Sequence, residues 1–109
     1  MRLALLPVVA LVGLTVAADP AHALDRRIKL INNSSYNIVE FHASNINRKS
    51  FEENILNNRI LQPGDSIIIN LDDGTDMCRF DFLTVMSNGN KIEKDDVDVC
   101  QLETYTIND

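Results

Sequence analysis

The chain has 109 residues, 45% of them hydrophobic, and a formal net charge of −6, which makes it long enough for one domain and too short for two. Its acidic balance argues against binding to nucleic acid or to anionic membrane surfaces, because both attract basic patches. The same balance permits a basic partner or a divalent cation, and it also keeps an exported protein soluble.

The first 23 residues have the pattern of a secretory signal peptide. Arg2 supplies a positive start, residues 3–18 form an uncharged apolar run, and Asp19-Pro20 ends that run. Residues 21–23 (Ala-His-Ala) fit the small-x-small motif that signal peptidase cleaves. We therefore predict cleavage after Ala23 and a single mature domain over residues 24–109, periplasmic or secreted.

The apolar run has 16 residues, fewer than the roughly 20 that a membrane-spanning helix needs. An N-terminal core helix or a membrane anchor is the alternative interpretation of this segment. The signal peptide interpretation predicts a mature form without a membrane span, whose charge stays −6 because the removed segment carries one Arg and one Asp.

Cys78 and Cys100 are the only two cysteines, and both lie in the predicted mature part. In an oxidising compartment an even pair indicates a disulfide. Closing a loop of this length stabilises a protein by about 3 kcal/mol in the chain-entropy model. A redox-active pair is the alternative, but the C-x-x-C spacing that tunes a thiol pKa is absent.

Short runs of β-favouring residues, separated by turn formers, cover most of the mature chain. The clearest strand candidates are Ile28–Ile31, Tyr36–Ala43, Ser66–Leu71, Cys78–Met86 and Thr104–Ile107. In the second of these, Val39, Phe41 and Ala43 share one face, and Ile38, Glu40 and His42 share the other. Residues 67, 69 and 71 face one way in the third, and the fourth is apolar on both faces, which favours a central strand.

One helix is predicted between the second and third strand candidates. Ser50 lies three residues before Glu53, which is the spacing of a capping box. Phe51, Ile55 and Leu56 follow on one side, so we expect about two helical turns that end near Asn57-Asn58. Gln62-Pro63-Gly64-Asp65 then predicts a type II turn into the third strand.

Asn88-Gly89 is the strongest hairpin signal in the chain. A two-residue loop at 88–89 would place Cys78 opposite Val99. A three-residue loop at 88–90, with Gly89 or Asn90 in the left-handed conformation, would place Cys78 opposite Cys100. A bulge along residues 93–96 would have the same effect. The whole pattern predicts an all-β fold: a small β-sandwich of six or seven short strands with one short helix and one disulfide.

The residues offer no recognisable catalytic constellation. His42 is the only histidine after the predicted cleavage site, and we interpret it as an exposed strand residue rather than a catalytic base. The glycines at 64, 74 and 89 are isolated in predicted turns, so they form neither a nucleophile elbow nor a phosphate-binding loop. We assign no catalytic residue, no metal ligand and no cofactor.

Between residues 72 and 98 aspartates are plentiful, at positions 72, 73, 76, 81, 95, 96 and 98. A glycosidase needs two carboxylates across a sugar-sized cleft, one with a raised pKa, whereas most of these lie in solvated turns. Residues 72–76 are also a candidate calcium loop, alone or with residues 95–98. They depart from the EF-hand spacing, and ordinary Asp-Gly turn chemistry is the simpler interpretation.

Several segments resemble a widespread group of small exported bacterial proteins, found mainly in alphaproteobacteria, that has no settled function. The segments are Ile31–Ser34, Leu61–Gly64, Cys78–Phe82, Asn88-Gly89 and Val97–Cys100. The resemblance implies export and a β-domain, and it supplies no catalytic residue. Some members of this group carry an argininosuccinate lyase label, which this chain does not fit, because that enzyme resembles a long, helix-rich tetramer.

The sequence therefore predicts a non-enzymatic periplasmic binding or envelope-associated module whose partner is an unknown protein or envelope component. A calcium-dependent small exported protein is the first alternative, and an enzyme of unrecognised type is the second.

Overall fold

The computed structural model describes residues 25–48 and 50–109, which form six β-strands in two sheets. The predicted signal peptide and its cleavage site lie outside these residues. In chain order the strands are β1 (Arg27–Asn33), β2 (Ile38–Asn45), β3 (Ser66–Asn70), β4 (Arg79–Met86), β5 (Lys91–Asp98) and β6 (Thr104–Asn108). The part of the chain that is described holds no helix long and apolar enough to cross a membrane.

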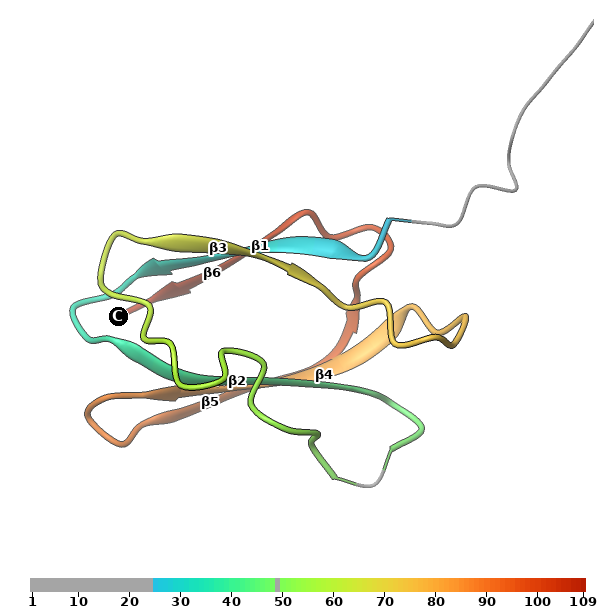
Figure 1. The fold of residues 1–109 in the computed structure, drawn as a ribbon, viewed down its shortest axis with the longest axis horizontal. Helices are drawn as coiled ribbons and strands as arrows, with labels where there is room; N and C mark the ends of the chain where they lie inside the picture. The colour runs from blue at the N-terminus through green and yellow to red at the C-terminus, as the bar shows by residue number, and fades with distance from the viewer. Residues whose placement is uncertain (1–24, 49) are drawn as a thin grey trace, which may run out of the picture.

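The two sheets lie as two layers (Figure 1). One has the order β3-β1-β6, in which β1 is antiparallel to β3 and parallel to β6. The other has the order β2-β4-β5 and is antiparallel throughout. The all-β, sandwich-like class predicted from the sequence is confirmed, with six strands.

The core lies between the layers because alternate side chains of each strand point inward. Phe41 of β2 and Phe82 of β4 meet edge to face, with ring centroids 5.1 Å apart. Tyr105 of β6 packs on Phe82 from the opposite sheet, with the two ring centroids 5.0 Å apart. Aromatic packing therefore joins the two layers. Burial raises the pKa of the Tyr105 hydroxyl.

Two predictions about strand faces are confirmed. Ile67, Ile69 and Leu71 pack on or against the core, as the alternation predicts. β4 is the central strand of its sheet, which explains why Leu83 and Val85 on its outer face are also half-buried.

The predicted helix over residues 50–58 is wrong. Residues 51–54 have no regular structure, two tight turns follow, and Asn57 and Asn58 both have positive φ. The Ile55 amide donates to the Phe41 carbonyl at 2.8 Å instead of to a carbonyl one helical turn back. Hydrogen bonding to the neighbouring strand β2 therefore replaces the local helix that the capping box favours.

The predicted facing of Ile38 is also wrong. The register between β2 and β4 shifts between Ile38 and Glu40, so one extra residue is accommodated there. The bulge turns Ile38 into the core, where it is fully buried, while Glu40 and His42 stay on the outer face.

The hairpin between β4 and β5 differs from both predicted loops. Met86 pairs with Asn90, so the loop comprises residues 87–89, with Gly89 at φ 91°. A bulge follows where predicted, at Asp96, whose φ is 57°. Together they place Cys78 opposite Val99, whose amide donates to the Cys78 carbonyl at 2.8 Å.

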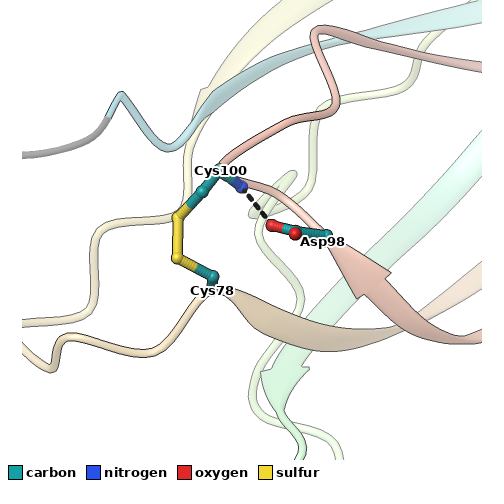
Figure 2. A group of neighbouring side chains, drawn as sticks. All are labelled: Cys78, Asp98 and Cys100. Carbon is teal, nitrogen blue, oxygen red and sulfur yellow. Dashed lines mark hydrogen bonds between the residues drawn. A yellow bond between two sulfur atoms is a disulfide. The ribbon is translucent and has the colours of Figure 1, made fainter.

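The predicted disulfide is present between Cys78 and Cys100, with their Cα atoms 5.3 Å apart (Figure 2). It joins the start of β4 to the turn that follows β5, one residue beyond the paired position. Closing 22 residues of chain at the open end of this hairpin restricts the unfolded chain more than the folded one.

Asn32, near the end of β1, makes more side-chain hydrogen bonds than any other buried polar residue among those that the structure describes. Its Nδ2 donates to the carbonyls of Tyr36 and Leu61 at 2.8 and 2.9 Å, and its Oδ1 accepts from the Ser34 amide and hydroxyl. The residue is 0% exposed. It therefore fixes the β1–β2 corner and, through Leu61, the approach to β3.

We predict that Asn32→Ala lowers the free energy of unfolding by about 2–4 kcal/mol, because it leaves buried partners without a hydrogen bond. Asn33→Ala is the matched control, since its amide makes one exposed bond to Asn108, and it should cost below about 1 kcal/mol. Urea unfolding of the mature domain measures both, and equal losses would contradict the role given to Asn32.

We predict that replacing both cysteines with Ala lowers the free energy of unfolding by about 3 kcal/mol while the fold is kept. Mass spectrometry of protein taken from the periplasm should show the two thiols oxidised. Two free thiols in the exported protein would refute the pairing in the cell.

Candidate functional site

Four strands lie at the edges of the two sheets, and these edges differ in how far their backbone groups are covered or protected. The edge of β2 is covered by the segment of residues 50–61, called the covering segment below (Figure 1). Ile38 and Leu61 exchange two backbone hydrogen bonds, of 2.9 and 3.0 Å, and the Phe41 amide donates to the Asn54 side chain. The backbone groups of Ile38 and Phe41 at this edge are therefore paired within the chain.

The edge of β5 is protected by charge and by its bulge. The Asp96 amide donates to the Asp81 carboxylate at 2.9 Å, which holds the bulge in place. Lys94 lies opposite the core residue Phe82, yet it is exposed. A bulge and an inward-side lysine are both features that prevent a further strand from pairing.

The edges of β3 and β6 are open. In an antiparallel pair of strands, hydrogen-bonded residue pairs alternate with pairs that are not bonded. The pairs Arg26–Leu71 and Asn32–Asp65 on either side of β3 are bonded, so Ile67 and Ile69 are the residues whose backbone groups bond to β1. The amide and carbonyl of Ile68 therefore point away from β1. No hydrogen bond within residues 25–48 and 50–109 uses them.

A groove of about 450 Å³ with a mixed polar and apolar lining lies beside this open edge, between the covering segment and the start of β3. Its lining residues are Leu56, Arg59, Ile60, Leu61, Gly64, Asp65, Ser66 and Ile67. Ile60 is 54% exposed, and Ile68 on the outer face of β3 is 60% exposed. An unpaired strand edge, a surface groove and two exposed isoleucines thus occur together.

His42, interpreted from the sequence as an exposed strand residue, is only 15% exposed and is fully engaged. Its Nδ1 lies 2.6 Å from the Glu52 carbonyl oxygen and its Nε2 lies 2.8 Å from Glu40 Oε1. Both partners are acceptors, so each ring nitrogen that carries a proton faces an acceptor. This histidine fastens the covering segment to β2.

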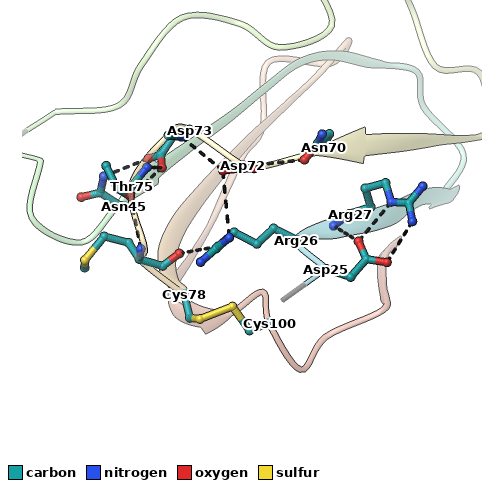
Figure 3. Close-up of polar contacts among 12 residues, drawn as sticks. Asp25, Arg26, Arg27, Asn45, Asn70, Asp72, Asp73, Thr75, Cys78 and Cys100 are labelled. Carbon is teal, nitrogen blue, oxygen red and sulfur yellow. Dashed lines mark hydrogen bonds and ion pairs between the residues drawn. A yellow bond between two sulfur atoms is a disulfide. The ribbon is translucent and has the colours of Figure 1, made fainter. Parts of the chain in front are cut away.

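Asp72 and Asp73 form hydrogen-bonded turns with the residues that follow them (Figure 3). The Asp73 carboxylate accepts from the Thr75 amide and hydroxyl and from the Asn45 side chain. Burial acts to raise the pKa of Asp73, but these hydrogen bonds outweigh it and hold the pKa below its ordinary value. Asp72 accepts from the Gly74 amide and lies 4.0 Å from the guanidinium of the buried Arg26.

A second acidic group, Asp81, Glu93 and Asp95, lines a smaller surface hollow on the outer face of the β2-β4-β5 sheet. The negative charge of Asp95 raises the pKa of the Glu93 carboxyl, with a smaller effect from Asp81. This is ordinary like-charge repulsion at the surface.

Only one group of three metal-ligating residue types converges in the described part of the chain, namely Cys78, Asp98 and Cys100. Its two sulfurs are joined in the disulfide, and Asp98 accepts from the Cys100 amide at 3.0 Å (Figure 2). The aspartates of residues 72–76 are not brought together with those of residues 95–98 in any such group of described residues.

No family model and no curated protein matches this chain. Among solved structures, it is similar to the NMR structure of a protein from Eubacterium rectale, with 18% sequence identity, 84% of each chain covered and a TM-score of 0.54. At this identity the similarity concerns the fold alone.

Sequence reasoning missed the groove and the open edge. The signal for the edge was present in Ser66–Asn70, a run of three isoleucines without charge or proline at a predicted strand. The groove had no local signal, because it forms where residues 56–61 and the start of β3 come together in the folded chain.

Proposed function

We propose that this chain is exported, loses residues 1–23 and works as a non-enzymatic binding module of the cell envelope whose ligand is another protein. The observation that carries the proposal is the open edge of β3 beside a surface groove and the exposed side chains of Ile60 and Ile68. Unpaired backbone next to exposed aliphatic side chains is a surface for protein contact.

The disulfide supports the proposed location, because such bonds persist in oxidising compartments outside the cytosol. The engagement of His42 with Glu40 and Glu52 supports a binding role over a catalytic one, since the ring already contacts an acceptor at each nitrogen.

The proposal is tested by site-specific photocrosslinking in the envelope of the native host. A benzophenone amino acid replaces Ile60 at the groove or, as the matched control, Ile46, which is 43% exposed and does not line the groove. We predict discrete protein adducts from position 60 and none of the same mass from position 46. Absence of adducts at position 60, or identical adducts at both positions, would contradict the proposal.

A further inference from the structure

We propose that Cys78, Cys100 and Asp98 form a zinc-binding site when the disulfide is reduced, so that either the sulfur–sulfur bond or a metal ion closes the open end of the β4–β5 hairpin. The starting observation is that the two sulfurs and a carboxylate oxygen of Asp98 all lie within 4.8 Å of one another. The site shares no residue with the groove beside β3, and the inference does not depend on the proposed function.

Backbone hydrogen bonds hold the two cysteines beside each other without the sulfurs. The Val99 amide donates to the Cys78 carbonyl at 2.8 Å, and the Val99 side chain is fully buried in the core. The Asp98 carbonyl accepts from the Leu102 amide at 2.9 Å, which closes the turn around Cys100. Because none of these bonds involves sulfur, we expect the two thiols to stay close after the disulfide is reduced.

The three side chains provide donors that suit zinc. Thiolates select soft metal ions such as zinc, which also binds carboxylate oxygen. With bonds of about 2.3 Å to sulfur and 2.0–2.2 Å to oxygen, neighbouring ligand atoms of a tetrahedral site lie about 3.6–3.8 Å apart. Rotation of the two reduced cysteine side chains brings the sulfurs to this separation while their Cα atoms stay 5.3 Å apart. Water fills the fourth position when the protein supplies three ligands.

The carboxylate of Asp98 is available to a metal ion. Its Oδ1 accepts from the Cys100 amide at 3.0 Å, and its Oδ2 has no hydrogen bond or ion pair with other described residues. Asp98 and both cysteines are half-buried, so an ion can reach them from solvent. Partial burial also strengthens the attraction between a cation and these groups relative to bulk water.

Two arginine side chains approach the site, and each is matched by another carboxylate. Arg79 lies opposite Asp98 in the register of β4 and β5, but its Nη1 is 3.4 Å from Asp96. The buried Arg26 lies 4.0 Å from Asp72 (Figure 3). Neither guanidinium pairs with Asp98, so its negative charge remains for a cation.

Reduction of the disulfide precedes zinc binding. A dithiol reductant converts the disulfide into two thiols through a mixed disulfide, and it is itself oxidised to a disulfide in this two-electron exchange. Zinc then binds the two sulfurs as thiolates and releases their two protons to solvent. Re-oxidation by a small-molecule disulfide takes the two electrons back and releases the ion. The disulfide and the metal are therefore mutually exclusive at this position.

The experiment titrates Zn²⁺ into the mature chain in its oxidised and reduced states. The reductant is a water-soluble phosphine, which becomes a phosphine oxide as one water molecule supplies the oxygen and the two thiol protons. We expect the reduced chain to bind one Zn²⁺ with a dissociation constant of about 1 µM or tighter, and the oxidised chain to bind at least about a hundredfold more weakly. Co²⁺ in place of Zn²⁺ should give the sulfur-to-metal absorption that shows thiolate ligation.

Two matched variants test the carboxylate ligand. Asp98→Asn keeps an oxygen that can accept from the Cys100 amide but removes the charge, and it should weaken Zn²⁺ binding at least about tenfold. Asp96→Asn is the control, since it removes an exposed carboxylate two residues away that contacts Arg79, and it should leave the affinity unchanged. The variant with both cysteines replaced by Ala should not bind.

Zn²⁺ at about a hundred times its dissociation constant should raise the unfolding midpoint of the reduced chain by at least about 10 °C and leave that of the oxidised chain unchanged. Equal affinity of the two states, equal losses for Asp98→Asn and Asp96→Asn, two chains per ion, or no binding by the reduced chain would each overturn the inference. Amide NMR spectra check the fold of the reduced chain. If reduction unfolds it, recovery of the native spectrum with Zn²⁺ would support the site, and failure to recover would refute it.

Discussion

The hydrogen bonds of the Asn32 side chain are the constraint on which the rest of the structure depends. One amide group, fully buried, links the end of β1 to Tyr36 at the start of the second layer and to Leu61 at the end of the covering segment. The backbone of the same residue pairs with Gly64 and Asp65 just before β3. An unpaired amide here would be costly, so the corner has one arrangement.

This corner also shapes the candidate binding surface. Leu61, Gly64 and Asp65, which Asn32 holds, are part of the groove lining, and Ser66 begins β3 directly after them. At the far end of the covering segment, Glu52 is held by Ser44 and His42. The segment is thus fixed at both ends along β2, and it covers that edge while leaving the edge of β3 open.

Period-two alternation predicted much of the fold because each strand buries one face. It placed Ile67, Ile69 and Leu71 inward and β4 at the centre of its sheet, and the parity of the cysteines predicted their disulfide. It failed at the bulge before Glu40, since a single extra residue reverses the facing of Ile38 and cannot be seen in a pattern of apolar residues.

The helix over residues 50–58 failed for a tertiary reason. Its capping signals are local, whereas the amides of Phe41 and Ile55 find partners across the gap between the covering segment and β2. The candidate site could not be predicted for the same reason: an open edge is defined by which strands do not pair, and that depends on the complete topology. Local sequence showed only that residues 66–70 form an uncharged strand.

Backbone amide hydrogen exchange of the free mature domain tests most directly the claim that the edge of β3 is open. The structure predicts slow exchange for Ile67 and Ile69, whose amides pair with β1, and exchange at least about a hundredfold faster for Ile68 between them. Protection of Ile68 equal to that of its two neighbours would mean that this edge is already occupied, and it would contradict the account.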